Sequence, residues 1–116
     1  MIKPLSHYLK AETAKLINET GAFFAHSEED LKEKSKDGIT YVSLGAALVA
    51  PEENASETAA KFSQVRVNAM LSDIAENSLE SIIEREETAY YNDPDYELEE
   101  YNALIAEYKQ AQRIAS

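Results

Sequence analysis

The chain of 116 residues contains no cysteine and no tryptophan, and only three glycines and three prolines. Without cysteine there are no disulfides, thiolate nucleophiles or cysteine-ligated zinc sites. The glycines are too widely spaced to form a phosphate-binding loop. No apolar run approaches the roughly 20 residues of a membrane helix, and the start, MIKPLSHYLK, lacks the apolar core of a signal peptide. We therefore expect a cytoplasmic protein that does not enter a membrane.

The remaining composition is that of a folded protein. Hydrophobic residues make up 44% of the chain and charged residues 28%, a balance that differs from the polar, highly charged profile of disorder. A chain of this length is sufficient for one ordinary domain. We expect a single domain over residues 1–116, with a helix and a small sheet in residues 1–50 and an acidic helical hairpin in residues 51–116.

Negative charge is concentrated in the middle of the chain. Residues 1–50 have a net charge of −1 (seven acids, six lysines) and residues 101–116 of +1 (one acid, two bases). Residues 51–100 hold fourteen acids and three bases, for a net charge of −11. A field of this sign repels nucleic acid and membrane phosphates and steers the protein toward basic surfaces. The charge pattern predicts no direct binding of nucleic acid.

The chain opens with a helical pattern. Leu5, Tyr8, Leu9 and Leu16 share one helix face, and Gly21 stands where a helix commonly ends in a left-handed residue. We expect this first helix to run to about residue 20.

Three short apolar runs predict strands. They cover residues 22–25, 39–44 and 46–50. Gly45 separates the last two runs, which indicates either a bulge or a tight reversal. Between the first two runs, Ser27 and Asp30 approximate a capping box for a short helix that ends near Ser35.

The second half of the chain predicts two long helices. Pro51 fits the first position of a helix, and apolar residues then recur every three or four positions up to about Tyr91. Because this pattern stays in phase across Asn77 and Ser78, we expect one helix, with Asn77 as the place for any kink.

A final helix is predicted to start with Asp93 as its N-cap. It carries a near-heptad seam of Leu98, Tyr101, Ile105 and Tyr108. The predicted fold class is therefore α+β: a small three-stranded sheet, an N-terminal helix and a C-terminal pair of long antiparallel helices.

Residues suited to catalysis or metal binding are few. His7 and His26 each stand next to a serine, but adjacent residues on a helix or strand do not face each other. A calcium loop starting at Asp93 would need glycine and glutamate where Leu98 and Leu104 stand. We expect no enzyme activity, no cofactor and no metal. An ordered pocket with either histidine beside a carboxylate would indicate an enzyme instead.

Acidic side chains recur along one side of the predicted long helix. The set is Asp73, Glu76, Glu80, Glu84 and Glu87. At steps of three and four they form a ladder of about one carboxylate per turn, ~5 to 6 Å apart. This spacing is close to the ~7 Å between phosphates along a nucleic-acid strand. A solvated helix face kept soluble by charge has the same pattern, so the ladder alone does not identify an interface.

Tyrosines among these acids favour an interface. Tyr90, Tyr91, Tyr96 and Tyr101 all lie in or next to the acidic stretch. Tyrosine is enriched in binding surfaces because it offers apolar area with a polar end. Tyr90 and Tyr101 fit the apolar stripes and are equally explained as core residues. Tyr91 and Tyr96 do not fit those stripes, and we expect them to contact a partner.

Three short motifs stand out along the chain: GAFFAHS (21–27), YVSLGAALVAPEENA (41–55) and REETAYY (85–91). They resemble those of an uncharacterised family of small bacteriophage and mobile-element proteins. The similarity spans about residues 15–92 and implies no activity or site residues. It implies a phage-like setting, in which small acidic proteins often act by binding and blocking a host machine.

The sequence thus predicts a non-enzymatic, acidic protein-binding module. Its partner would be a host or defence protein, whose basic, nucleic-acid-binding surface it would occupy as a nucleic-acid mimic. The alternative is a structural or regulatory homo-oligomer that pairs through the seam of its last helix.

Overall fold

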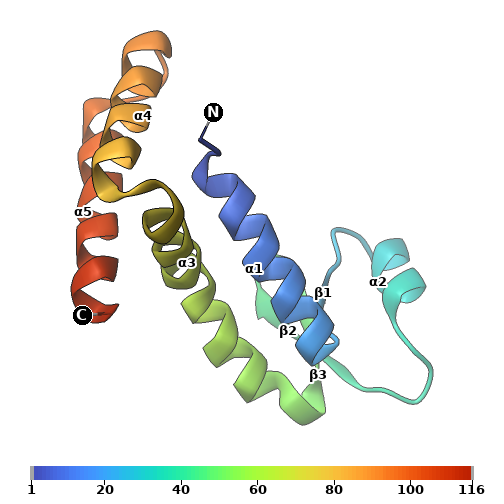
Figure 1. Ribbon diagram of the computed structural model, residues 1–116. Helices are drawn as coiled ribbons and strands as arrows, with labels where there is room; N and C mark the ends of the chain where they lie inside the picture. Colours follow the sequence, from blue (N-terminus) through green and yellow to red (C-terminus); the bar gives the residue numbers. More distant parts are fainter. Residues whose placement is uncertain (1, 116) are drawn as a thin grey trace. The chain divides into compact units, whose positions relative to one another are not determined.

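The computed structural model describes residues 2–115 (Figure 1). Its elements follow the order α1 Leu5–Thr20, β1 Phe23–Phe24, α2 Glu28–Lys34, β2 Tyr41–Gly45, β3 Leu48–Pro51, the 3-10 helix η1 Glu52–Asn54, α3 Ala55–Asn77, α4 Leu79–Asn92 and α5 Leu98–Ala115. The three strands form one antiparallel sheet in the order β1-β3-β2. This is the α+β class expected from the sequence, with its N-terminal helix, small sheet and C-terminal helices.

The chain divides into two compact units, one of which is discontinuous in sequence. A helical unit comprises Met1–Leu9 and Arg66–Ser116, and a sheet unit comprises Lys10–Val65. The sequence-based division at residue 50 followed the change in charge. The structural division instead falls inside α1 and inside α3.

The sheet unit is built around β3, the central strand. Leu48 and Ala50 of β3 are fully buried and pack with Ala22, and partly buried side chains cover this cluster: Phe24, Leu44 and Phe62. Gly21 ends α1 as predicted: its φ is 78° and its N–H donates to the carbonyl of Ile17 at 3.0 Å. Burial of the central strand on both sides explains why residues 48–50 are all apolar.

Both features that Gly45 could indicate, a bulge and a tight reversal, are present between β2 and β3. The register between β2 and β3 is irregular between Ser43 and Gly45. Ala46 and Ala47 then form a tight reversal with φ values of 51° and 65°. Two consecutive residues with positive φ are typical of a two-residue hairpin turn, in which asparagine and glycine are the usual residues.

The short helix α2 has the predicted N-cap. Ser27 Oγ accepts a hydrogen bond from the N–H of Asp30 at 3.1 Å. The carboxylate of Asp30 accepts in turn from the N–H of His26 at 3.1 Å. This bond is the main cause that lowers the pKa of Asp30. The reciprocal pair is a capping box shifted by one residue.

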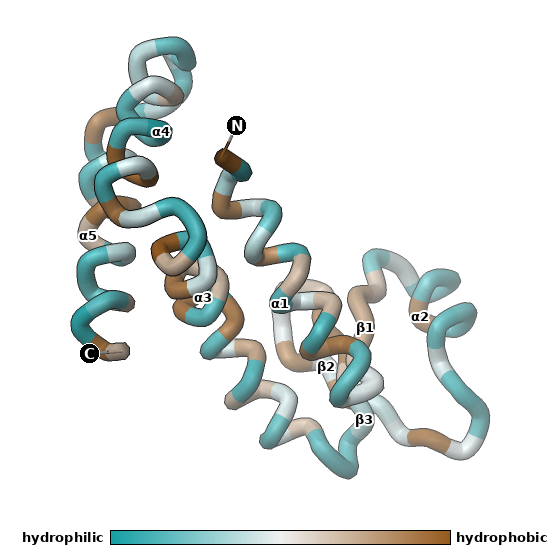
Figure 2. The backbone as a smooth tube through the Cα atoms, viewed as in Figure 1, coloured by the Kyte–Doolittle hydropathy of each residue, from teal (hydrophilic) through white to brown (hydrophobic). Residues whose placement is uncertain are grey.

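The helical unit packs α3, α4 and α5 around a second core. Met70, Ile82, Tyr108 and Ala111 are buried together, with Leu5 among the partly buried residues around them. Helices α4 and α5 form a hairpin (Figure 1), as the sequence predicted. Figure 2 shows hydrophilic and hydrophobic stretches alternating along both helices, as expected when each has one buried side.

The prediction of a single long helix was wrong, because Ser78 separates α3 from α4. Ser78 has φ 70° and ψ 153°, and its hydroxyl accepts from the N–H of Ser81 at 3.3 Å as the N-cap of α4. The apolar pattern concealed this break, since Ile74, Leu79 and Ile82 on both sides of it contribute to the same core. Pro51 also belongs to β3 instead of starting the helix.

The expected cap at Asp93 was also wrong. The N–H of Asp93 donates to the carbonyl of Ala89 at 3.0 Å and so ends α4. Its carboxylate accepts from the N–H of Asp95 at 2.9 Å, which makes a turn of the kind that aspartate favours. Helix α5 begins five residues later, at Leu98.

Candidate functional site

One side of α4 presents glutamates to solvent. Glu80, Glu84, Glu87 and Tyr91 follow at steps of four, three and four residues, so they lie on one helix face. All four are exposed, and Tyr91 keeps 80% of its accessible surface. We call these four residues the acidic face. The carboxylates predicted at positions 80, 84 and 87 are therefore brought together as expected, with an aromatic ring at the end of the row.

Asp73 does not belong to this face. Its side chain is fully buried, where Tyr108 donates to its carboxylate at 2.6 Å and Asn77 at 2.8 Å. The sequence-based assignment of Asp73 to an exposed ladder was wrong because helical spacing cannot distinguish an exposed carboxylate from one with a buried cationic partner. That partner is Arg85, which forms a salt bridge with Asp73 at 3.1 Å.

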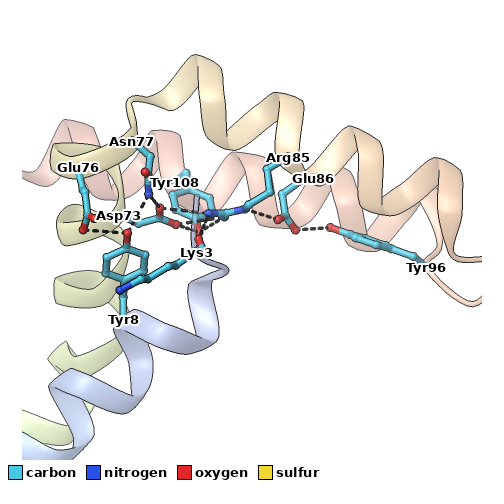
Figure 3. Close-up of polar contacts among 9 residues, drawn as sticks. All are labelled: Lys3, Tyr8, Asp73, Glu76, Asn77, Arg85, Glu86, Tyr96 and Tyr108. Carbon is cyan, nitrogen blue, oxygen red and sulfur yellow. Dashed lines mark hydrogen bonds and ion pairs between the residues drawn. The ribbon is translucent and has the colours of Figure 1, made fainter. Parts of the chain in front are cut away.

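Glu76 is exposed but lies on α3, before the break at Ser78. Its carboxylate accepts a hydrogen bond from the hydroxyl of Tyr8 at 3.0 Å, and Asn77 donates to that hydroxyl at 2.9 Å (Figure 3). The predicted row of five carboxylates is therefore reduced to three on α4, with Glu76 on a separate helix.

Arg85 is the centre of the buried polar network in Figure 3. Besides Asp73, its guanidinium donates to Glu86 at 2.8 Å, to the carbonyl of Lys3 at 2.8 Å and to the hydroxyl of Tyr108 at 3.1 Å. Burial alone would lower the pKa of Arg85, but the hydrogen bonds to Asp73, Glu86 and Tyr108 raise it above its usual value. Arg85 thus stays charged and links the N-terminal segment to α3, α4 and α5.

This network affects the charge of the surface. Arg85 is the only base in the sequence between Arg66 and Lys109. Its side chain is only 12% exposed, and its charge is engaged by Asp73 and Glu86. The single local cation is therefore directed inward, and the glutamates of the acidic face are left to define the outward charge of α4.

The four tyrosines form one cluster at the α4–α5 turn. The ring of Tyr90 lies 5.5 Å from that of Tyr91, 6.2 Å from Tyr96 and 6.1 Å from Tyr101. Tyr90 and Tyr101 are half-buried, in agreement with their place on the apolar stripes. Burial and, to a smaller extent, the Glu87 carboxylate raise the pKa of Tyr101.

Of the two tyrosines predicted to contact a partner, only Tyr91 points into solvent. Tyr96 is half-buried, and its hydroxyl donates to Glu86 at 3.1 Å. Burial and this carboxylate raise the pKa of Tyr96 to about 12. Its hydroxyl is therefore already used inside the hairpin.

One feature of α5 was not found from the sequence. Leu98 is 53% exposed, although the pattern placed it on the buried seam. Ile105 and Tyr108 are buried within the chain, as the predicted hairpin packing requires, and Tyr108 packs with Met70 of α3 and Ile82 of α4. This part of the seam is therefore not open to a second chain. Only the acidic character of neighbouring Glu97, Glu99 and Glu100 could have indicated the exposure of Leu98.

The histidines do not form a catalytic pair. His7 and His26 are both exposed, and the ring of His7 packs edge-on against Tyr8 at 5.0 Å. Within residues 2–115, no three histidine, aspartate or glutamate side chains are grouped so that they could hold a metal ion. No helix in the same range has the length and apolar character needed to cross a membrane.

A comparison with protein families yields a match to this chain. Neither the curated proteins nor the solved structures include a match to the chain. A family model described as a family of unknown function, DUF7659, matches residues 5–114. That range includes most of both units, the acidic face and the network around Arg85 except for Lys3. Because the match covers nearly the whole chain, the protein belongs to the DUF7659 family.

Proposed function

We propose that the protein is a non-enzymatic, acidic protein-binding module that occupies a basic, nucleic-acid-binding surface of another protein. The observation that carries the proposal is the acidic face: Glu80, Glu84 and Glu87 exposed in one row on α4, with the exposed ring of Tyr91 at its end. The charges supply steering toward a basic surface, and the ring supplies apolar contact area.

The spacing of the row supports a surface that normally binds phosphates. Carboxylates one helical turn apart are separated by ~5 to 6 Å, close to the ~7 Å between successive phosphates of a strand. Like charges at this spacing destabilise an isolated helix slightly, and a basic partner relieves that repulsion. Binding of a cationic partner would therefore stabilise α4.

The proposed biological setting is the bacterial cytoplasm, with a phage or mobile-element protein that inhibits a host or defence protein by competition. The resemblance of the three motifs supports this setting. The alternative of a homo-oligomer that pairs through Leu98, Tyr101, Ile105 and Tyr108 loses support, because Ile105 and Tyr108 are buried within the chain.

The test begins with capture of partners from a bacterial lysate on the tagged protein at low and moderate salt. A captured protein is then purified, and its complex with a labelled nucleic acid is titrated with the wild-type chain. We expect the wild type to displace the nucleic acid, and less efficiently as salt rises. The variant Glu80→Lys/Glu84→Lys/Glu87→Lys should not displace it.

A matched control carries the same change of charge elsewhere. Glu33, Glu52 and Glu53 are exposed residues of the sheet unit, and their replacement by lysine should leave displacement unchanged. Circular dichroism checks that both triple variants keep their helix content. Equal displacement by the acidic-face variant and the wild type would refute the proposal.

A further inference from the structure

A shallow groove runs between α4 and α5, which lie side by side in the helical unit (Figure 1). Its lining extends along α5 from Tyr101 to Arg113, twelve positions or ~18 Å, which is the length of about three helical turns. The groove therefore has room for a short helix. Four of the side chains that line it are wholly or largely apolar: Ile83 of α4, and Tyr101, Ile105 and Ala106 of α5.

An exposed leucine continues this apolar lining toward the α4–α5 turn. Leu98 is 53% exposed and precedes Tyr101 by three residues and Ile105 by seven, so the three share one face of α5. Single exposed apolar residues are common on protein surfaces, whereas those that adjoin an apolar groove mark interaction sites. The groove together with Leu98 is therefore suited to the apolar side of an amphipathic helix.

The α5 side of the groove is basic. Lys109 and Arg113 line it, and none of the described residues that line it is acidic. A second hollow is lined by the same two bases and by Leu79, one turn before Ile83 on α4. Lys109 is exposed and forms no ion pair within residues 2–115, although the chain holds 22 acids and 11 bases. An acidic group is therefore what this side of the groove can accept.

The α4 side of the groove is bordered by acids. Glu80 and Glu87 stand three residues before and four residues after Ile83, and residues at these spacings are neighbours on a helix surface. Both are exposed members of the acidic face. A helix in the groove would thus lie between glutamates on α4 and the two bases on α5.

We propose that the α4–α5 groove binds an amphipathic helix of a protein partner that has one acidic and one basic flank. Its apolar side lies on Ile83 and Ile105, its acidic flank faces Lys109, and its basic flank faces the glutamates of α4. Burial of the apolar side supplies affinity, and the charged flanks fix the direction of the helix, because reversal would place like charges together on both sides. The site borders the acidic face, but it requires no nucleic-acid-binding partner.

Binding of designed peptides to the full chain tests this inference. The probe is a fluorescein-labelled, alanine-rich peptide of about 18 residues, long enough to form some helix alone, with a leucine stripe, glutamates along one flank and lysines along the other. Two further peptides have glutamate on both flanks or lysine on both. In fluorescence anisotropy at about 0.15 M salt, the mixed peptide should have a dissociation constant at least about tenfold below those of the other two.

Charge reversal at Lys109 tests the acidic flank. Lys109→Glu should raise the dissociation constant of the mixed peptide about tenfold and lower that of the peptide with two lysine flanks. Lys32→Glu is the matched control, because Lys32 is exposed in the sheet unit and its reversal changes the net charge by the same amount. It should leave the ratio of the two dissociation constants unchanged.

A bulky side chain at Ala106 tests the place of binding. Ala106→Tyr puts a ring into the groove without a change of charge and should raise the dissociation constant of the mixed peptide at least about tenfold. Ala103→Tyr is its control, because Ala103 is exposed on α5 but does not line the groove. Circular dichroism checks that the variants keep their helix content.

Four results would overturn the inference. They are equal binding of the three peptides, an equal effect of glutamate at positions 32 and 109, an equal effect of tyrosine at positions 103 and 106, and occupation of the groove by a second copy. The last would appear in sedimentation equilibrium as a wild-type mass that rises from 13.0 kDa with concentration and a constant mass for Ala106→Tyr. The peptide assay contains no captured partner, and the displacement assay contains no peptide, so the two proposals can fail separately.

Discussion

The guanidinium of Arg85 spans both carboxylate oxygens of Asp73, with Nη1 at 3.2 Å from Oδ1 and Nη2 at 3.1 Å from Oδ2. This two-pronged pair joins α4 to α3 on either side of the break at Ser78. Since Asp73 is fully buried, its charge depends on this partner and on the hydroxyl of Tyr108. The pair therefore helps to fix the position of α4 relative to α3.

Replacement of Arg85 by leucine should destabilise the protein by about 3 to 5 kcal/mol, because it leaves the Asp73 carboxylate buried without a cation. Urea denaturation measures the change in the free energy of unfolding. The double variant Asp73→Leu/Arg85→Leu removes both charges and should recover a large part of that loss. A double variant no more stable than the single one would show that the pair is not the cause.

Replacement of Ser78 by glycine should stabilise the protein by about 1 kcal/mol. At φ 70° and ψ 153°, Ser78 occupies a backbone region that is nearly reserved for glycine, and the loss of its capping hydroxyl costs only a few tenths of a kcal/mol. The control is Ser72→Gly at an exposed position inside α3, which should instead destabilise the protein, because glycine is a poorer helix residue than serine. Thermal unfolding distinguishes the two signs, and destabilisation by both variants would contradict this reading of Ser78.

Replacement of Ala47 by glycine should also be stabilising. Ala47 has φ 65°, and an L-residue in the left-handed region costs roughly 1 to 2 kcal/mol, part of which is offset by the greater freedom of glycine in the unfolded chain. Ala59→Gly, at an exposed position of α3, is the matched substitution and should destabilise by about 1 kcal/mol. The difference between the two variants in free energy of unfolding is the quantity to measure, and a value of the opposite sign would refute the prediction.

Alkaline pH should destabilise the hairpin. Burial and the Glu86 carboxylate raise the pKa of Tyr96 to about 12, from 10.0 for a free tyrosine. Between these two values the folded state keeps a proton that the unfolded state releases, so the free energy of unfolding falls as pH rises through this window. Burial raises the pKa of Tyr108 as well, with the same sign. Tyrosinate absorbance in the ultraviolet and unfolding measured against pH test this, and Tyr96→Phe should make the decline shallower. A steeper fall of the free energy of unfolding with pH in Tyr96→Phe would contradict the prediction.

The elements marked by local chemistry could be predicted from the sequence. The end of α1 at Gly21 and the cap of α2 at Ser27 depend on residues within one turn of the boundary, and both were placed correctly. That Glu80, Glu84 and Glu87 share one helix face likewise follows from helical spacing. In each case the residues that make the prediction possible lie within a few positions of the structure that they predict.

The features that were missed depend on residues far apart in the chain. Asp73 is separated from Arg85 by twelve residues and from Tyr108 by thirty-five. A pattern read along one helix cannot show that such residues meet, so a buried ion pair was mistaken for part of an acidic surface. The break at Ser78 was hidden for a similar reason, because the core needs apolar residues in phase on both sides of it.

The discontinuity of the helical unit also sets an order of folding during synthesis. The hydroxyl of Tyr8 donates to Glu76, which is translated 68 residues later. The carbonyl of Lys3 accepts a hydrogen bond from Arg85, which is translated 82 residues later. The sheet unit, residues 10–65, is complete before either partner has been translated. It can therefore fold co-translationally, whereas the helical unit closes only after the last helix has emerged.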